Sequence, residues 1–194
     1  MEFSSEKIKV WDVFVRLFHW TVVTLFFCNY LLSERDMPFA RGNTLHRYAG
    51  YIVIGFVLAR LIWGVIGSKN ARFKNFIPNP SEFMSYMRAM LRGEHPYYEG
   101  HNPAGAVMIV CLLSGLLLTG LSGWLASLAD VYDGWQASVA MATDFIDWGE
   151  VHEFFANLTM LGAGIHITAV VLVSHLTREN LVHAMLSGYK KKPK

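Results

Sequence analysis

Residues 150–176 read EVHEFFANLTMLGAGIHITAVVLVSHL, and this stretch decides the fold class. It exceeds the roughly 20 helical residues that cross a hydrocarbon core of about 30 Å, and it is mostly apolar. Three histidines, His152, His166 and His175, lie inside it. An ionisable side chain in a membrane span is costly unless it faces the protein interior and has a partner, so these histidines are candidate functional residues.

Three further stretches have the same character, at residues 13–32, 46–67 and 104–127. The chain as a whole is 53% hydrophobic and only 16% charged, which is too apolar for an ordinary soluble domain. We therefore predict an all-α integral membrane four-helix bundle that forms one domain over residues 1–194. The segment 68–103 is the one long loop, and residues 81–91 within it have the spacing of a short interfacial helix.

The first span is expected to be a retained helix and not a cleaved signal peptide. It contains Arg16 and His19, and the polar sequence SERDMPF follows it where a signal peptide would have small residues. The two cysteines, Cys28 and Cys111, lie in apolar spans outside any C-x-x-C-H motif. We interpret both as small buried apolar residues.

Lysine and arginine residues near the span ends predict the orientation. They are concentrated in the N-terminal tail, the 68–103 loop and the C-terminal tail, whereas residues 130–150 contain acids and neither Lys nor Arg. Both termini are therefore expected on the cytoplasmic side of a bacterial inner membrane. The positive residues behind the net charge of +2 are accounted for by their positions near the ends of the membrane spans, so we expect no nucleic-acid partner. The lysine-rich tail 190–194 is expected to contact membrane lipid.

Helical geometry sorts the histidines of the last span. His152 and His166 are 14 residues apart, which corresponds to a rotation of about −40° and a rise of about 21 Å, so they share a face at two depths. His175 comes nine residues after His166 and points about 180° away, beside Arg178. We expect His175 to be an interfacial residue.

Depth then pairs these histidines with others. His19 is expected roughly 12 Å from the cytoplasmic face and His166 roughly 18 Å from it, so the two form an inner pair. The second span begins outside, which places His46 at the outer boundary with His152 as an outer pair. Two helices that each supply one histidine are a usual way to build a cofactor site in a bundle.

Paired histidines indicate haem more than zinc. Two imidazoles saturate a haem iron and leave a centre suited to electron transfer, whereas zinc prefers three or four clustered ligands. A single histidine could instead be an interhelical hydrogen-bonding residue, but four that pair by depth favour two non-covalent b haems. Gly50 and Gly162, each four residues from a ligand histidine, would make room for a flat macrocycle.

Arginines near these histidines are candidate partners for haem propionates. Arg16 lies one turn from His19, Arg47 follows His46, and Arg60 lies on nearly the same face as His46 but at the inner level. For Arg16 and Arg47 a role as topology determinants explains the sequence equally well.

Six stretches together resemble a known family: VWDVFVRLFHW, LHRYAGY, ARLIWGVIGSKNARF, GHNPAGA, VHEFFANL and GIHITAVVLVSH. In order and spacing they are similar to the bacterial cytochrome b561 family, and to the cytochrome b subunits of nickel-iron hydrogenases. The resemblance implies an inner-membrane four-helix fold with two b haems, ligated by His19, His46, His152 and His166, and quinone-linked electron transfer. The family's G-H-N-P motif falls on residues 100–103, where a helix cap by Asn102 and Pro103 is a sufficient structural explanation.

The leading hypothesis is therefore an electron-transfer oxidoreductase. It would exchange electrons between ubiquinol or menaquinol and a redox partner such as a c-type cytochrome or a dehydrogenase subunit. Glu153 and the acidic outer loop could accept protons, although a solvated acidic face explains them as well. Two alternatives stay open: a haem-bearing anchor subunit of a hydrogenase or dehydrogenase, and a haem-free transporter that uses its intramembrane histidines.

Overall fold

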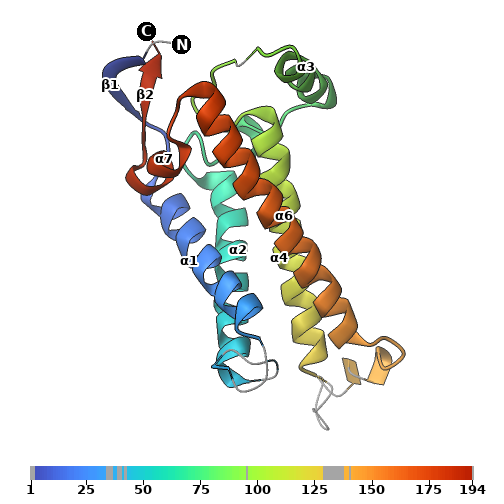
Figure 1. Cartoon of the computed structure of the whole chain (residues 1–194). Coiled ribbons are helices and arrows are strands. Elements are labelled where there is room, and N and C mark those ends of the chain that lie inside the picture. The colour runs from blue at the N-terminus through green and yellow to red at the C-terminus, as the bar shows by residue number, and fades with distance from the viewer. Residues whose placement is uncertain are drawn as a thin grey trace. The chain divides into compact units, whose positions relative to one another are not determined.

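Four long helices dominate the chain (Figure 1). The computed structural model describes residues 3–33, 37–38, 41, 43–94, 96–128, 138–139 and 141–193. Within them α1 (Val13–Leu31), α2 (Thr44–Ile66), α4 (Pro103–Ala126) and α6 (Trp148–Thr177) are long and apolar enough to cross a membrane. The four predicted spans are thus confirmed as helices to within a few residues, consistent with a membrane helical bundle.

Apolar side chains cover much of the surface of these helices. Val65 and Ile66 are each 70% exposed and Leu31 is 62% exposed. An aqueous surface with so many large exposed apolar groups would favour association, whereas lipid tails cover such groups without cost. The exposure therefore agrees with a membrane location for all four helices.

The chain divides into two compact units, and each is described by itself. The first unit contains Met1–Trp20, Ala59–Cys111 and Gly162–Lys194, and the second contains Thr21–Leu58 and Leu112–Leu161. Each of the four long helices is divided between the two units. His19 and His166 fall in the first unit, and His46 and His152 fall in the second.

The two chain ends meet in the first unit as an antiparallel pair of strands (Figure 1). Strand β1 (Phe3–Lys9) pairs with β2 (Tyr189–Pro193), with Lys7 opposite Lys191 and Lys9 opposite Tyr189. The all-α prediction missed this sheet, because short polar strands carry no apolar alternation. Lys190 also differs from the expected lipid contact: it is 8% exposed, and its Nζ lies 3.3 Å from Glu179.

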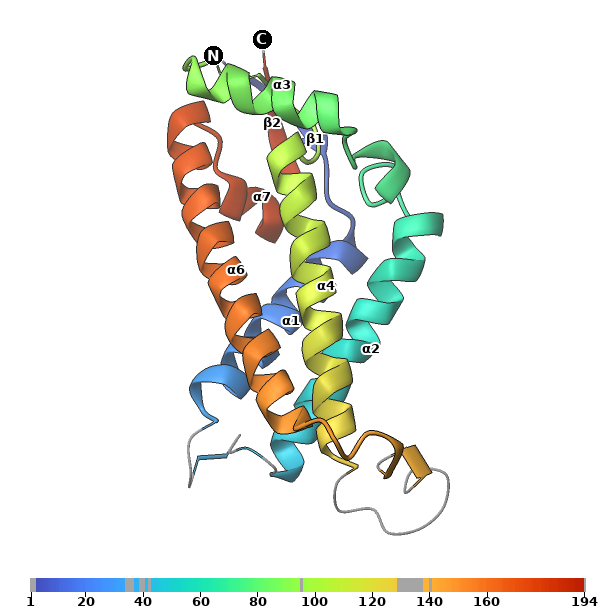
Figure 2. The same cartoon turned by 90° about the vertical axis from the view of Figure 1, so that its right-hand side faces the viewer.

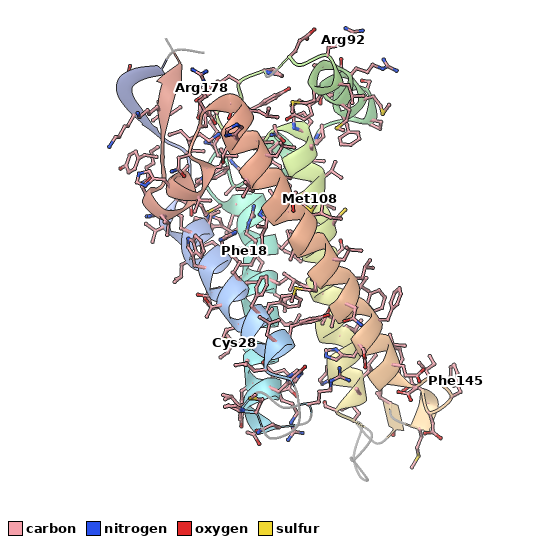
Figure 3. All side chains as sticks on the ribbon, in the orientation of Figure 1. Phe18, Cys28, Arg92, Met108, Phe145 and Arg178 are labelled. Carbon is pink, nitrogen blue, oxygen red and sulfur yellow. The ribbon has the colours of Figure 1, made fainter. Side chains whose placement is uncertain are left out.

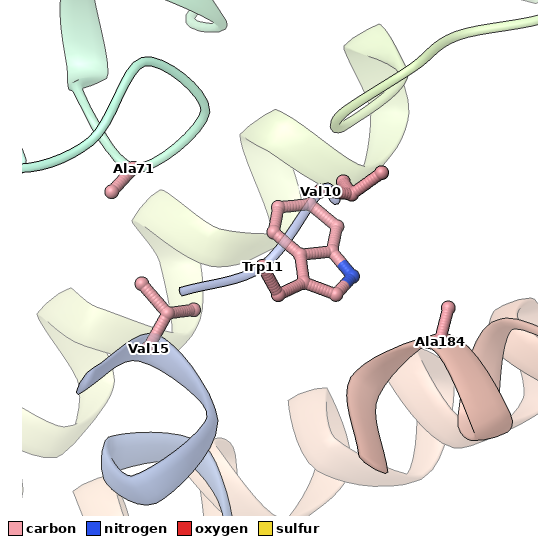
Figure 4. Close-up of a cluster of buried hydrophobic side chains, with 5 residues drawn as sticks. All are labelled: Val10, Trp11, Val15, Ala71 and Ala184. Carbon is pink, nitrogen blue, oxygen red and sulfur yellow. The ribbon is translucent and has the colours of Figure 1, made fainter. Parts of the chain in front are cut away.

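A small buried cluster anchors these ends to the helices of the same unit (Figure 4). It consists of Val10, Trp11, Val15, Ala71 and Ala184. The Val10 and Trp11 amides donate to the Gly188 carbonyl at 2.8 and 3.1 Å. Gly188 ends α7 (Leu181–Ser187) in the left-handed conformation, with φ of 88°, that favours glycine.

Asp12 fixes the start of α1. Its carboxylate accepts hydrogen bonds from the Val15 amide at 2.8 Å, from Trp63 Nε1 at 3.0 Å and from the Ser68 hydroxyl. Burial raises the pKa of Asp12, but these hydrogen bonds more than offset that, so its pKa lies below the usual 3.8. One carboxylate thus caps α1 and ties it to the end of α2 and to the loop after it.

The long loop contains a 3₁₀ turn η1 (Phe73–Asn75) and the helix α3 (Pro80–Leu91). Asn79 and Glu82 form a capping box at its start, with Pro80 at the first helical position, which confirms the short helix expected at 81–91. Figure 2 shows α3 lying crosswise to the first turns of α4, within the first unit.

The second unit packs α2, α4 and α6 closely through small residues. A Cβ added at Gly115 would lie 2.5 Å from Thr159 Oγ1, and one at Gly120 would lie 2.0 Å from the end of Ile54. Thr119 Oγ1 donates to the Gly115 carbonyl at 2.8 Å. Small residues let membrane helices approach this closely.

Some of the sequence features lie outside the described residues. These are Lys194 of the lysine-rich tail and residues 129–137, which include part of the acidic stretch 130–150. The orientation assigned from charge is therefore taken up below as a proposal.

Candidate functional site

The structure brings the histidines together in the two pairs that the sequence predicted. The ring centroids of His19 and His166 lie 6.5 Å apart, with an angle of 60° between the rings. Those of His46 and His152 lie 6.1 Å apart, at 80°. Each pair lies wholly within one unit.

These separations fit two imidazoles on opposite sides of one metal ion. With metal–nitrogen bonds of about 2.0–2.1 Å, two such rings have centroids about 6.3 Å apart. Both observed values, 6.1 and 6.5 Å, are close to this separation. The donor set also suits haem, for which two neutral imidazoles are good axial ligands.

The described part of the chain offers no alternative cluster of metal ligands. There, no three His, Cys, Asp or Glu side chains gather in a group that could hold a metal ion. Zinc, which prefers three or four such ligands, fits less well than haem.

The second unit holds His152 in a defined orientation. Its Nδ1 lies 2.8 Å from the Thr119 carbonyl oxygen, which can only accept, so Nδ1 carries the proton. The lone pair is then on Nε2, the nitrogen left for a metal. A Cβ added at Gly123 would lie 2.8 Å from the His152 ring, so glycine is needed for the ring to lie against α4. The partner His46 is tied through its carbonyl, which accepts from Asn29 Nδ2 at 3.1 Å.

In the first unit, the ring of His19 is oriented by different contacts. His19 Nδ1 is buried and has no hydrogen-bond partner among the described residues. The edge of Trp20 packs against the ring of His19, at 5.0 Å between centroids and 84°. Packing, and not a backbone hydrogen bond, therefore orients His19.

Arg60 is the most deeply buried of the three candidate arginines, at 3% exposed. Its Nη2 donates to the Ala71 carbonyl at 3.1 Å, and its guanidinium lies 5.0 Å from the centre of the Phe73 ring. Nη1 is buried without a partner among the described residues. Arg16 Nη1 instead donates to the Leu186 carbonyl at 2.7 Å, which ties α1 to α7, while Arg16 Nε is buried and unpartnered. Arg47 is exposed.

The remaining sequence-selected residues are placed as follows. His175 is exposed, in agreement with an interfacial residue. Cys28 is half-buried and Cys111 is exposed, so the expectation that both are buried was wrong for Cys111. A Cβ at Gly50 would meet only the Asn29 amide, at 4.0 Å, which leaves room beside His46. Glu153 pairs with Arg41 at 2.7 Å on the surface.

Sequence reasoning missed three residues at these sites. Thr119 and Gly123 orient His152, and the signal for them was the run of small residues at 115, 119, 120 and 123 on one face of α4. The third residue is His101, whose Nδ1 is buried and unpartnered, in the motif interpreted as a helix cap alone. The cap is present, since Asn102 Oδ1 accepts from the Gly105 amide at 2.7 Å.

Comparison with known proteins decides the family. The family model described as prokaryotic cytochrome b561 matches residues 10–188. The chain belongs to the prokaryotic cytochrome b561 family. This cytochrome is therefore a haem-b membrane protein of electron transport, and the haem-free transporter hypothesis is abandoned.

Several relatives match this chain over most of their length. One from Rhodobacter capsulatus is 24% identical, and the match covers 95% of this chain and 81% of the relative. One from Bradyrhizobium diazoefficiens is 23% identical over 93% and 85% of the two chains, and one from Cupriavidus necator is 24% identical over 96% and 89%. Each is named "Probable Ni/Fe-hydrogenase B-type cytochrome subunit". No solved structure matches significantly.

Proposed function

We propose that this cytochrome b561-family protein binds two b haems and transfers electrons between a quinone/quinol pool and a redox partner in a bacterial inner membrane. The observation that carries the proposal is the presence of two separate histidine pairs, each at a separation that suits one iron. A haem iron with two imidazole ligands exchanges single electrons without an open coordination position.

His19 and His166 would hold one haem, and His46 and His152 the other. The Thr119 carbonyl keeps the proton of His152 on Nδ1 and so leaves Nε2 as the ligand atom. Gly123 and Gly50 keep side-chain bulk away from this pair. The chain thus supplies preset ligand orientations, which limit the rearrangement that accompanies a change of charge at the metal.

Arginines would pair with the haem propionates. Arg60 suits this role best, because a buried guanidinium with a free N–H needs an anion. Arg16, already bound to the Leu186 carbonyl, would offer only its Nε. Arg47 would act from the surface beside His46.

Both termini are proposed to face the cytoplasm. Figure 3 labels Arg92, after α3, and Arg178, after α6, both in the first unit. Lys7, Lys69 and Lys191 belong to the same unit. Positive residues close to span ends are retained on the cytoplasmic side, so the first unit is assigned to that side.

A second role follows from the names of the relatives, which are hydrogenase cytochrome subunits. The chain would then be the haem-bearing membrane anchor of a hydrogenase or dehydrogenase complex, without turnover of its own. Mild solubilisation and affinity purification distinguish the two: a stoichiometric hydrogenase or dehydrogenase partner supports the anchor role, and quinol oxidation by the isolated chain supports the independent one.

The test of the main proposal is the haem content and reducibility of the purified protein. We expect two haems per chain, extracted by acidic organic solvent since no C-x-x-C-H motif tethers them, and we expect a quinol analogue to reduce both. A ratio near one would remove one histidine pair from the proposal. If saturating quinol left both haems oxidised while a soluble protein donor reduced them, the quinol-linked role would fail.

Arg60→Gln provides a finer test in the same preparation. Loss of a cation near a propionate should make the haem of His19 and His166 harder to reduce, so its midpoint potential should fall while the other haem keeps its potential. Redox titration followed by absorbance measures both. An unchanged potential would return Arg60 to a purely structural role.

A further inference from the structure

Arg60 is a buried cation that forms no ion pair with any of the described residues. Its side chain is 3% exposed, its Nη2 reaches only the Ala71 carbonyl, and its Nη1 has no partner among the described residues. None of the ion pairs found in the described part of the chain includes it. Burial of an unpaired charge is strongly unfavourable, so a negatively charged group next to Arg60 would stabilise the protein.

Asp12 is the carboxylate that interacts electrostatically with Arg60, but it already accepts hydrogen bonds from other residues. Its oxygens accept hydrogen bonds from Val15, Trp63 and Ser68 at the start of α1. Asp12 therefore lowers the electrostatic cost of burying Arg60 but does not satisfy its free N–H.

His101 is a second buried polar side chain in the same unit. Its ring lies between Trp11, at 4.4 Å, and Phe76, at 4.7 Å between centroids, and its Nδ1 is buried without a partner. Burial, and to a smaller extent electrostatic interaction with Arg60, Lys190 and His166, lowers the pKa of His101 to about 3. The imidazole is thus neutral, and the charged side chains of Arg60 on α2 and Lys190 on β2 interact with it electrostatically.

Arg60 and His101 each contact a residue of the buried cluster that Figure 4 shows. Arg60 donates to Ala71, and His101 stacks on Trp11, and both partners belong to that cluster. The backbone after His101 is also fixed, because Asn102 caps α4 and Pro103 begins it. Two buried nitrogens that have no partner among the described residues, Arg60 Nη1 and His101 Nδ1, are therefore held against the same cluster.

We propose that Arg60 and His101 form a carboxylate-binding site that holds a propionate of the haem ligated by His19 and His166. This inference rests on the proposed function and adds His101 as a positioning residue. A guanidinium N–H and an imidazole N–H together suit the two oxygens of a carboxylate, and a carboxylate supplies the negative charge that Arg60 lacks. Arg60 and His101 belong to the same unit as His19 and His166, and His166 is one of the groups that interact electrostatically with His101, so the propionate is assigned to the haem of that pair.

The experiment compares His101→Phe with the wild type as purified haem-loaded proteins. Phenylalanine keeps an aromatic ring between Trp11 and Phe76 and removes only the N–H donors. We expect two haems per chain in both proteins. At a fixed potential near the wild-type midpoint, the ratio of reduced to oxidised inner haem should fall about tenfold in the variant, equivalent to about 59 mV for one electron. The propionate-bending band of the inner haem in resonance Raman spectra should also shift.

Two further variants keep the test decisive. His101→Gln restores an N–H donor and should return the potential and the band toward the wild type. His183→Phe removes an exposed histidine of α7 and should change neither. Should His101→Phe fail to fold, the comparison of His101→Gln with His101→Leu serves instead, with the shift expected in leucine alone.

The outcomes separate this inference from the function on which it rests. Two haems with unchanged potentials and an unchanged propionate band in His101→Phe would overturn the carboxylate site and leave the di-haem proposal intact. A wild-type protein with a single haem, retained after His19→Ala, would overturn both. A shift of equal size in His183→Phe would show that the effect is general and would also overturn the site.

Discussion

The two units hold their histidine pairs by different means. In the second unit, close helix packing through Gly115, Gly120 and Gly123 brings α4 against its neighbours, and the Thr119 carbonyl fixes the proton of His152. In the first unit, charged and polar contacts among the chain ends and loops dominate, and His19 has no hydrogen bond at Nδ1. The second unit orients His152 with the backbone of α4, whereas the first unit contains buried polar nitrogens that have no partner among the described residues.

Under the proposed function, this difference would give the two haems different properties. A ligand imidazole that donates to a carbonyl is a stronger base than one without a partner, and a nearby cation favours the reduced state of a haem. Because all four proposed ligands are histidines, the surroundings alone would make the reduction potentials of the two haems differ.

The largest expected effect comes from removal of a ligand. Replacement of His46 or His152 by alanine should abolish the same haem, and replacement of His19 or His166 should abolish the other, because each iron needs both of its imidazoles. Pyridine haemochrome analysis gives the haem ratio and low-temperature spectra identify which haem remains. His175→Ala is the control, and it should keep both haems because His175 is exposed. Loss of a haem in that control would undermine the assignment.

A smaller effect should follow from Gly123→Ala, which tests the close packing of the second unit. The new Cβ would lie 2.8 Å from the His152 ring, so the ring must move and its hydrogen bond to Thr119 must lengthen. We expect the haem of His46 and His152 to be lost several-fold faster to an apomyoglobin acceptor, with the other haem unaffected. Gly55→Ala, in the same unit, is the matched control because nothing lies within 4 Å of its added Cβ. Equal rates in both variants would contradict the role of Gly123.

The smallest effect concerns the polar ties of the first unit. Asp12→Asn weakens hydrogen bonds to a charged acceptor and should lower the free energy of unfolding by about 1–2 kcal/mol, since the site is partly exposed. The pKa of folded Asp12 lies below 3.8, so its charged form stabilises the fold above that pH, and this contribution is lost as the pH falls through the folded pKa.

Thermal melts of the two proteins in detergent should therefore differ at pH 6 and converge on acidification. The exposed Asp144→Asn is the control, and it should melt like the wild type at each pH. A gap between wild type and Asp12→Asn that widened at low pH would contradict the sign of this linkage.

The four spans and the histidine pairing could be predicted from the sequence because both depend on helical periodicity. Length and hydropathy bounded α1, α2, α4 and α6, and a spacing of 14 residues put His152 and His166 on one face. His175 was separated from them by the same rule.

Contacts between residues far apart in the sequence escaped prediction. The pairing of β1 with β2 joins opposite ends of the chain, and polar strands of this length carry no pattern. The burial of Lys190 depends on Glu179 and on the Tyr98 carbonyl, 92 residues away. His101 was interpreted through its neighbours Asn102 and Pro103, whereas its surroundings come from Trp11 and Phe76.

The pairing of the four histidines is tested most directly by the haem content of double variants. In His19→Ala/His166→Ala both substitutions fall on one pair, so one haem per chain should remain, with the spectrum of the His46 and His152 site. In His46→Ala/His166→Ala one ligand is missing from each pair, so both haems should be lost. Retention of one haem in this second variant, or loss of both in the first, would contradict the account.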